Sequence, residues 1–358
     1  MRAGTYTGNY TAGNDGTLAN RIAISAYTGE KPVINGTLSI TGDYVTITGI
    51  EIKNTGWTEG RESTQAGAPW EIATPNILIP SGDNIEMINC ILHDGSQGAG
   101  WFGQGGTMYG CLIYHNGLKS TASPQGHGVY PQNNTPRKTL KHNIIFDNFG
   151  WGVHGYTSDV GKQHRITLDG NIIFNNGSVF GAAYPNFTLE NTAEAEAELT
   201  VINNLTYQPA GEATQNAIGN SAATDVTFTD NYTPEHTEVG GVANFLANSG
   251  NYDGASGIGD QVFVIANDYD ATRCHVAIYN QAEAATVDVD VSAVYSNGDT
   301  IKVYNVQDYP NDVQTLTVTL GVITVNMQAA NRTVAAPYGW TAPAKSFPQF
   351  GAFVAVKQ

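Results

Sequence analysis

Short stretches of alternating or consecutive apolar residues run through the first 250 residues, and turn-forming Asn, Asp and Gly separate them. The apolar spacing of an amphipathic helix is rare in this part of the chain. The stretches are instead rich in the β-branched residues that favour strands. The pattern therefore predicts many short strands joined by frequent turns.

One unit recurs along these residues: a small or polar residue, three mostly apolar residues, then Asp, Asn or His near a Gly. Strong copies begin at positions 90, 111, 143 and 171, and weaker ones at 49, 204 and 231. The steps between 90, 111, 143, 171, 204 and 231 are 21, 32, 28, 33 and 27 residues. Such steps suit a solenoid whose coils hold three short strands and loops of variable length. An all-β parallel β-helix is predicted over residues 1–250.

Coils of such a solenoid stack at about 4.8 Å, so equivalent side chains form ladders. Cys90 and Cys111 are then neighbouring rungs, and we expect buried free thiols that pack as small hydrophobes. The Asn at the start of the later units is expected to stack in a turn ladder and to bind no ligand.

The pattern changes near Gly250. Short alternating strands follow at sandwich-like intervals, as in "QVFVIAND", "HVAIYNQ" and "GAFVAVK". They predict a compact β-sandwich over residues 251–358, with a linker at 246–260.

Charge and composition narrow the partners. The 16 Lys and Arg against 32 Asp and Glu give a formal charge of −16, which repels nucleic acid and anionic membranes. A strongly anionic glycan is also disfavoured unless local Arg or Lys or a bound cation reverses the potential. Three cysteines cannot form a dense disulfide framework. No apolar run reaches transmembrane length and no signal peptide begins at Met1, so we expect a leader or N-terminal cap upstream.

Loop lengths indicate where a site would lie. The chain takes a long excursion from Asn116 to Val129 and another from Asn176 to Phe187, whereas 148–153 is almost direct. A short coil between two long ones predicts a groove whose floor is the short coil.

Period-two alternation selects the side chains of this surface. If Val129 and Val153 point inward, their strands direct four polar or aromatic side chains outward. These are Tyr130, Gln132, His154 and Tyr156. A His with an ordinary pKa near 6.5 can accept a proton, and a Tyr can relay one. His127 lies where the long loop meets its strand and is a second candidate base.

Aromatic and acidic residues gather near the same coils. Exposed rings stack on sugars, and Trp101 and Trp151 are candidates, although the parity of Trp151 with Val153 also fits the core. An insertion from 54 to 74 adds Trp57, Arg61 and Trp70. Hydrolysis would need two carboxylates about 5–9.5 Å apart. The candidates are Asp94, Asp147, Asp159 and Glu190.

The stretch from Gly126 to Gly177 resembles bacterial right-handed parallel β-helix proteins of the pectate-lyase-like superfamily. Residues 16–52 are similar to the first coils of that group, and "FGAFVAV" is similar to its C-terminal β-domain. The resemblance implies a right-handed helix and an extracellular, secreted protein. Of the polygalacturonase motifs only 126–128 matches, because no Asp-Asp is present and 165–167 lacks the lysine. A polygalacturonase is therefore disfavoured.

The resulting hypothesis is a polysaccharide-cleaving enzyme, with a β-eliminating lyase favoured over a glycoside hydrolase. In the lyase, His154 or Tyr130 removes the proton α to a uronate carboxyl, Gln132 or Asn133 helps neutralise that carboxyl, and Arg165 binds it. No cofactor is required, although calcium is possible. The rival hypotheses are a non-catalytic glycan-binding or tailspike-like adhesion protein and a purely structural solenoid. The protein is expected to be a monomer or a trimer, and the sugar, its linkage and endo or exo action stay open.

Overall fold

The computed structural model describes residues 1–57, 60–63, 76–120, 126–180, 184–195, 197–209, 216–218, 225–234, 239–240, 250–253 and 257–358. The chain divides into two compact units. The first comprises Met1–Ala255 together with Ala336–Thr341, and the second comprises Ser256–Ala335 with Ala342–Gln358.

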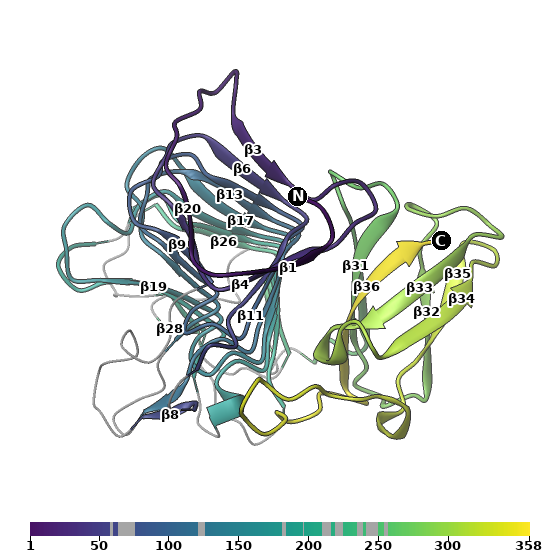
Figure 1. Cartoon of the computed structure of the whole chain (residues 1–358). Coiled ribbons are helices and arrows are strands. Elements are labelled where there is room, and N and C mark those ends of the chain that lie inside the picture. Colours follow the sequence, from purple (N-terminus) through teal and green to yellow (C-terminus); the bar gives the residue numbers. More distant parts are fainter. Residues whose placement is uncertain are drawn as a thin grey trace. The chain divides into compact units, whose positions relative to one another are not determined.

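The first unit is a parallel β-helix built from three long sheets, in which every strand pairs with its equivalents in the preceding and following coils (Figure 1). The ten-stranded sheet has the order β1 (Gly4–Thr7), β4 (Pro32–Asn35), β7 (Glu51–Lys53), β11 (Ile91–His93), β14 (Leu112–Tyr114), β18 (Ile144–Phe146), β21 (Ile172–Phe174), β24 (Leu205–Tyr207), β27 (Tyr232–Thr233) and β29 (Tyr252–Asp253).

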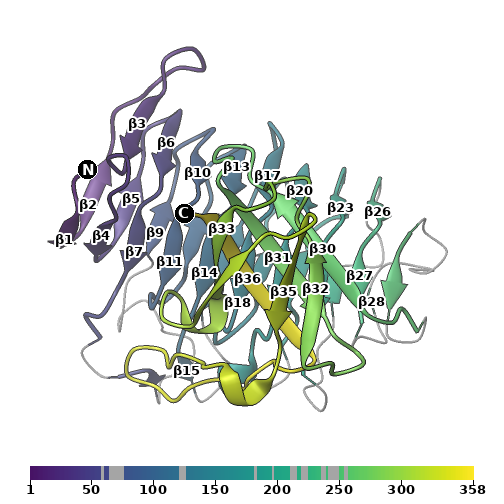
Figure 2. The ribbon, with the colours of Figure 1, turned by 90° about the vertical axis from the view of Figure 1, so that its right-hand side faces the viewer.

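The eight-stranded sheet crosses Figure 2 from purple to teal, in the order of the chain. Its strands are β3 (Ile22–Ser25), β6 (Val45–Thr48), β10 (Glu86–Ile88), β13 (Gly106–Tyr109), β17 (Lys138–Lys141), β20 (Ile166–Asp169), β23 (Thr200–Ile202) and β26 (Thr227–Thr229).

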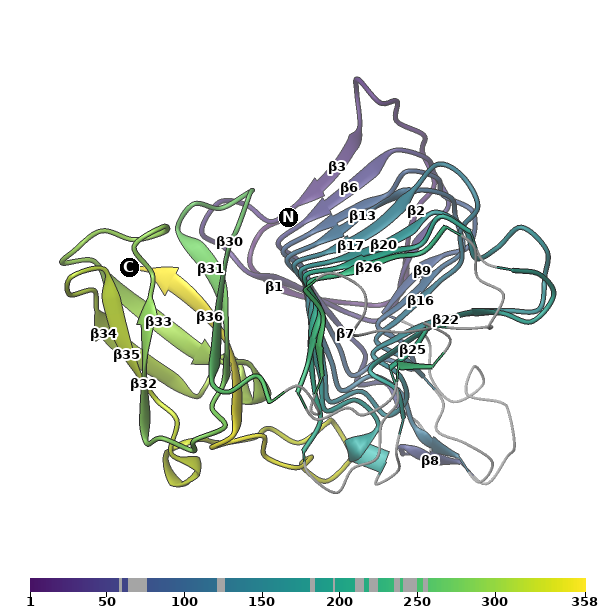
Figure 3. The same cartoon turned by 180° about the vertical axis from the view of Figure 1, so that it is seen from behind.

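The nine-stranded sheet carries the candidate site, and several of its strands are labelled in Figure 3. Its strands are β2 (Tyr10–Ala12), β5 (Leu38–Ile40), β9 (Ile77–Ile79), β12 (Ala99–Trp101), β16 (Val129–Pro131), β19 (Val153–Thr157), β22 (Phe187–Asn191), β25 (Asn216–Ile218) and β28 (Val239–Gly240). A small pair, β8 (Glu62–Ser63) with β15 (Lys119–Ser120), and a 3-10 turn, η2 (Ser178–Phe180), lie outside the three sheets. The predicted parallel β-helix is confirmed.

Alternation along each strand fills the interior of the solenoid. Ile47 and Leu168 of the eight-stranded sheet and Val129 of the nine-stranded sheet come from different coils, and all three are fully buried in one continuous cluster. Because the side-chain period of a strand is two, the residues between such positions face outward. The core is therefore a column of aliphatic side chains that runs along the axis.

Two ladders of asparagine amides join successive coils. In the first, Asn143 donates through Nδ2 to Oδ1 of Asn171 (2.9 Å), Asn171 to Asn204 (2.9 Å), and Asn204 to Asn231 (3.0 Å). These residues are at most 2% exposed. The predicted stacking of the anchor asparagines is confirmed. A second ladder connects Asn76, Asn116, Asn148 and Asn176 through amide-to-amide bonds, and it ends at Asn186, ten residues after Asn176 in the same coil.

Cysteine occupies the first ladder position in two earlier coils. The backbone N–H of Cys90 donates to Sγ of Cys111 (3.3 Å), and the N–H of Cys111 donates to Oδ1 of Asn143 (3.0 Å). Both thiols are free and fully buried. They are adjacent rungs, as the repeat spacing predicts.

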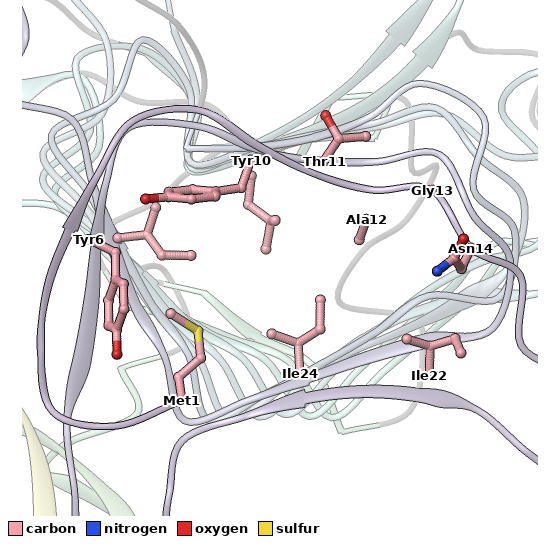
Figure 4. A pocket seen from close by; sticks show the side chains of 11 residues that line it. Met1, Tyr6, Tyr10, Thr11, Ala12, Gly13, Asn14, Ile22 and Ile24 are labelled. Atoms are coloured by element: carbon pink, nitrogen blue, oxygen red, sulfur yellow. The ribbon is translucent and has the colours of Figure 1, made fainter.

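The N-terminal coil leaves the solenoid interior partly open. A cavity of about 390 Å³ lies there, and Figure 4 shows the apolar and tyrosine side chains around it. Its lining includes Met1, Tyr6, Tyr10, Ile22, Ile24 and Leu38. This cavity is lined by the first coils and shares no residue with β16 or β19.

The second unit contains a five-stranded antiparallel sheet and a two-stranded one. The larger has the order β30 (Gln261–Ala266), β31 (Arg273–Tyr279), β36 (Phe350–Lys357), β33 (Thr300–Asn305), β34 (Val313–Thr317), and the smaller pairs β32 (Thr286–Asp290) with β35 (Val322–Asn326). Two 3-10 turns, η5 (Val306–Asp308) and η6 (Ala329–Asn331), connect strands. Val276 and Phe353 of the larger sheet share one buried cluster with Val289 and Ile323 of the smaller, so the unit is a small β-sandwich. Among the described residues, no helix has both the length and the apolar character needed to cross a membrane.

Candidate active site on the nine-stranded sheet

Two neighbouring strands present the predicted outward side chains. Val129 of β16 and Val153 of β19 are partners across the ladder and are both fully buried. Alternation from these valines turns the intervening side chains away from the core. Tyr130, Gln132, His154 and Tyr156 are accordingly half-buried at the surface.

Two histidines form a hydrogen-bonded pair at the centre of this surface. Nδ1 of His154 lies 3.0 Å from Nε2 of His127. Burial lowers the pKa of His154 to about 4, and burial together with the nearby His154 lowers the pKa of His127 well below its usual value. Both imidazoles are therefore neutral at pH 7, and one donates to the other. In the tautomer in which His154 donates through Nδ1, its Nε2 carries a lone pair that can accept a proton.

Aromatic rings enclose this imidazole. The ring of Trp151 stacks on His154 at 4.3 Å with 9° between the planes. Tyr130 and Tyr156 also stack on it, at 5.5 Å and 5.6 Å. Tyr184 contacts Trp151 edge to face at 4.6 Å. Sequence reasoning missed Tyr184, because it lies before the strand β22 and only its neighbour in space marks it as part of the site.

Trp101 is not part of this surface, and its prediction as a sugar-stacking residue is wrong. The side chain is 0% exposed and belongs to the core. Its position on β12 is in phase with Ala99, which pairs with the inward Val129. Nζ of Lys138, also buried, lies 4.3 Å from the centre of the indole ring.

Asn133 likewise cannot bind substrate through its amide, since it is 0% exposed and fully used in a turn. Its Oδ1 accepts from the N–H of Gly105 (2.8 Å), and its Nδ2 donates to the carbonyls of Pro136 (3.0 Å) and His164 (2.9 Å). The guanidinium of Arg165 is ion-paired with Glu198 at 2.6 Å. The structure thus brings His127 and the four outward residues together with Trp151, and it gives Asn133 a structural role.

The four candidate carboxylates lie in different surroundings. Asp94 pairs with Arg61, Asp147 is fully buried, and Asp159 pairs with Lys162. Two of the four lie near the site: Glu190 is the ladder partner of Tyr156, and Asp159 is close enough to Tyr130 to help raise the pKa of its hydroxyl.

The predicted groove walls include residues 121–125 and 181–183, which lie outside the described residues, so the groove stays a prediction. Trp70 of the insertion also lies outside the described residues. Among the residues that the structure describes, no group of three or more His, Cys, Asp or Glu is arranged to hold a metal ion. A bound calcium stays a prediction as well.

The fold and this surface together define a three-sheet parallel β-helix protein with a histidine pair among aromatic rings. The family model described as "Right handed beta helix region" matches residues 19–233. The match spans more than half of the 358 residues, so the chain belongs to this family. The right-handed parallel β-helix that the sequence resemblance implied is thereby confirmed.

Several solved structures are similar to this chain. Pectate lyase Pel9A is 17% identical with a TM-score of 0.43, over 64% of this chain and 69% of that one. The A-module of the Azotobacter vinelandii mannuronan C-5 epimerase AlgE6 is 13% identical with a TM-score of 0.38, over 70% and 91%. The Dettilon tailspike protein (gp208) is 13% identical with a TM-score of 0.28, over 98% and 87%. No curated protein matches the sequence significantly. At such low identities, the activity must be inferred from the residues of this chain.

Proposed function

We propose that this protein cleaves an extracellular polysaccharide at the surface around His154, by β-elimination at a uronate unit. The observation that supports this proposal is the neutral His127–His154 pair among stacked aromatic rings. A neutral imidazole can take up a proton, and the rings offer flat faces on which sugars stack.

In the proposed reaction, Nε2 of His154 removes the proton on the carbon α to the uronate carboxyl. The electron pair of that C–H bond forms a double bond to the adjacent carbon, whose bond to the glycosidic oxygen breaks. The hydroxyl of Tyr130 donates a proton to the departing oxygen. Burial raises the pKa of Tyr130, so the hydroxyl is protonated at neutral pH and can serve as the acid.

His127 has a supporting role in this scheme. It is 7% exposed, and its Nε2 accepts from Nδ1–H of His154 in the reactive tautomer. That hydrogen bond strengthens as His154 becomes cationic, which stabilises the protonated base. Gln132, whose Nε2 donates to the carbonyl of Tyr156 at 3.3 Å, lies at the same surface and would help neutralise the substrate carboxyl.

The test is incubation of the purified protein with alginate, polygalacturonate and neutral polysaccharides, with ultraviolet absorbance and reducing ends recorded together. We expect new absorbance from unsaturated ends and its reduction by about 10²–10⁴-fold in His154→Gln. The matched control is His164→Gln, because His164 is a half-buried histidine paired with Glu194 at 2.8 Å and is not in contact with the pair. Equal loss in both variants, or reducing ends without absorbance, would contradict β-elimination at His154.

Glycan binding without cleavage is the second candidate, and the half-buried ring pair of Trp151 and Tyr184 favours it. Retarded migration in gels that contain a polysaccharide from the panel, with no new ends, would support this alternative. We further propose that the protein is secreted. We also propose that it is a monomer or a trimer, and the molar mass of the purified chain from light scattering distinguishes these two states.

A further inference from the structure

We propose that residues Ala336–Thr341, here called the strap, position the aromatic wall of the His154 surface through Trp340. The strap is separated by more than 80 residues from the end of the solenoid, yet it belongs to the β-helix unit while its chain neighbours on both sides belong to the other. The functional consequence rests on the proposed function, whereas the positioning itself does not.

The strap is anchored at Tyr338 by two backbone hydrogen bonds. The Tyr338 carbonyl accepts from Nε of Arg61 (2.9 Å), and its N–H donates to Oδ1 of Asp94 (2.8 Å). Arg61 and Asp94 are themselves ion-paired at 2.6 Å, and the Arg61 side chain is 0% exposed. A buried pair in which all three guanidinium nitrogens donate hydrogen bonds holds a fixed geometry, so this anchor is rigid.

Arg61 also ties the anchor to the coils. Its Nη1 donates to the carbonyls of His115 (2.6 Å) and Gly117 (2.9 Å), both in the turn after β14. Its guanidinium lies over the rings of Trp57 at 4.4 Å and Phe149 at 5.2 Å. Arg61 thus anchors the strap, whereas the sequence had suggested that it lies with Trp57 and Trp70 near a glycan groove.

Two residues beyond the anchor, Trp340 contacts the chain segments that lead into the site. Its ring meets Phe149 at 5.5 Å, and its Nε1 donates to the carbonyl of Val179 (3.2 Å). Phe149 lies two residues before Trp151, and Val179 lies five residues before Tyr184. Those two aromatic residues contact each other and make the wall beside His154. One indole thus contacts Phe149 and Val179, which precede Trp151 and Tyr184 in the chain.

Trp340 is therefore a positioning residue. It is half-buried, it belongs to neither the histidine pair nor the stacked rings, and it acts through Phe149 and Val179. Without its indole, the Trp151–Tyr184 wall loosens and water reaches the imidazole. Because burial is what lowers the pKa of His154 to about 4, added water would raise that pKa toward its ordinary value.

Acid titration of tryptophan emission tests this coupling without any substrate. A cationic imidazole stacked on Trp151 quenches the emission of that tryptophan. The pH-dependent change in emission that is absent in His154→Gln is therefore assigned to the titration of His154. The titratable groups around it are His127, Tyr130 and Tyr156, with Glu190 of β22 beside Tyr156 and Asp159 after β19 near Tyr130. Trp151 stacks on it, and Thr188 of β22 is its ladder partner. We expect the inflection to move upward by about one pH unit in Trp340→Ala. A shift about half as large is expected in Trp340→Phe, which keeps a ring on Phe149 but loses the bond to Val179.

The control is Tyr269→Ala, an exposed aromatic residue of the second unit, which should leave the inflection in place. If Trp340→Ala does not fold, the Phe variant decides. An unmoved inflection in the folded variants overturns the proposal. If a polysaccharide is cleaved, KM in Trp340→Ala should rise by about three- to tenfold, as expected for weakened aromatic contacts. A shifted inflection in a protein without glycan activity would keep the strap and reject the proposed function.

Discussion

Removal of one rung of the first asparagine ladder should destabilise the β-helix strongly, and Asn171→Ala is the most informative change. Oδ1 of Asn171 accepts from the N–H of Asn143 (3.0 Å) and from its Nδ2 (2.9 Å). Its Nδ2 donates to the carbonyl of Leu140 (2.8 Å) and to Oδ1 of Asn204 (2.9 Å). Asn204 still accepts from the N–H of residue 171 in the variant. Three buried groups therefore lose a partner: the Asn143 N–H, one proton of its amide, and the Leu140 carbonyl.

Each buried polar group left unsatisfied costs about 1–3 kcal/mol. Three such groups sum to about 3–9 kcal/mol. Because losses above about 4–5 kcal/mol are exceptional for one substitution, we expect the free energy of unfolding to fall by about 3–5 kcal/mol. Guanidinium denaturation followed by tryptophan emission measures this value. All five tryptophans lie in Met1–Ala255 or Ala336–Thr341, so their emission reports on the β-helix unit and not on the sandwich.

The matched control is Asn20→Ala, because the exposed Asn20 side chain makes no hydrogen bond among the described residues. Its free energy of unfolding should change by no more than about 0.5 kcal/mol, as is typical of surface substitutions. A loss below about 1 kcal/mol in Asn171→Ala would refute the assignment of stability to the ladder, since it would mean that the orphaned groups find other partners.

Two more changes test the buried polar groups. Burial lowers the pKa of His115 to about 3, so the folded state keeps it neutral while the unfolded state takes up a proton below about pH 6.5. Stability is therefore lost as the pH falls from about 6.5 toward 3. Between pH 7 and pH 5, His115 accounts for a loss of about 2 kcal/mol in the free energy of unfolding, and this loss should be absent in His115→Asn. Denaturation curves recorded at the two pH values measure it. Lys138→Met should lower the free energy of unfolding by about 3 kcal/mol or more. The reason is that the ammonium donates to the carbonyls of Trp101 (3.0 Å), Gly103 (2.6 Å) and Gln132 (2.7 Å). Lys141→Met, at a half-buried position on the same strand, should lower it far less.

The solenoid was predictable because its signals are local and repeated. Period-two alternation marks the strands, and the asparagines at 143, 171, 204 and 231 mark one corner of each coil. The same alternation placed His154 and Tyr130 side by side on the surface, where the structure has them. The same alternation is consistent with the buried position of Trp101, because Trp101 is in phase with Ala99, the ladder partner of the inward Val129.

The remaining parts of the site depend on contacts that no local pattern encodes. Alternation ends where a strand ends, so it says nothing of Asn133, whose amide turns into the corner. Arg61 and Tyr338 are 277 positions apart, and Trp340 and Val179 are 161 apart. Such contacts depend on the three-dimensional fold, because it brings together residues that are far apart in the sequence.

The two asparagine ladders have a common polarity. In the amide-to-amide bonds between neighbouring coils, the Nδ2 of the earlier asparagine donates and the Oδ1 of the later one accepts. A duplicated coil inserted between two existing ones would therefore find an amide donor in the coil before it and an amide acceptor in the coil after it. Coils of different length would differ only in their loops. The protein can in this way grow or shrink by whole coils through gene duplication or deletion, so the length of its surface is open to evolution while the corner chemistry stays constant.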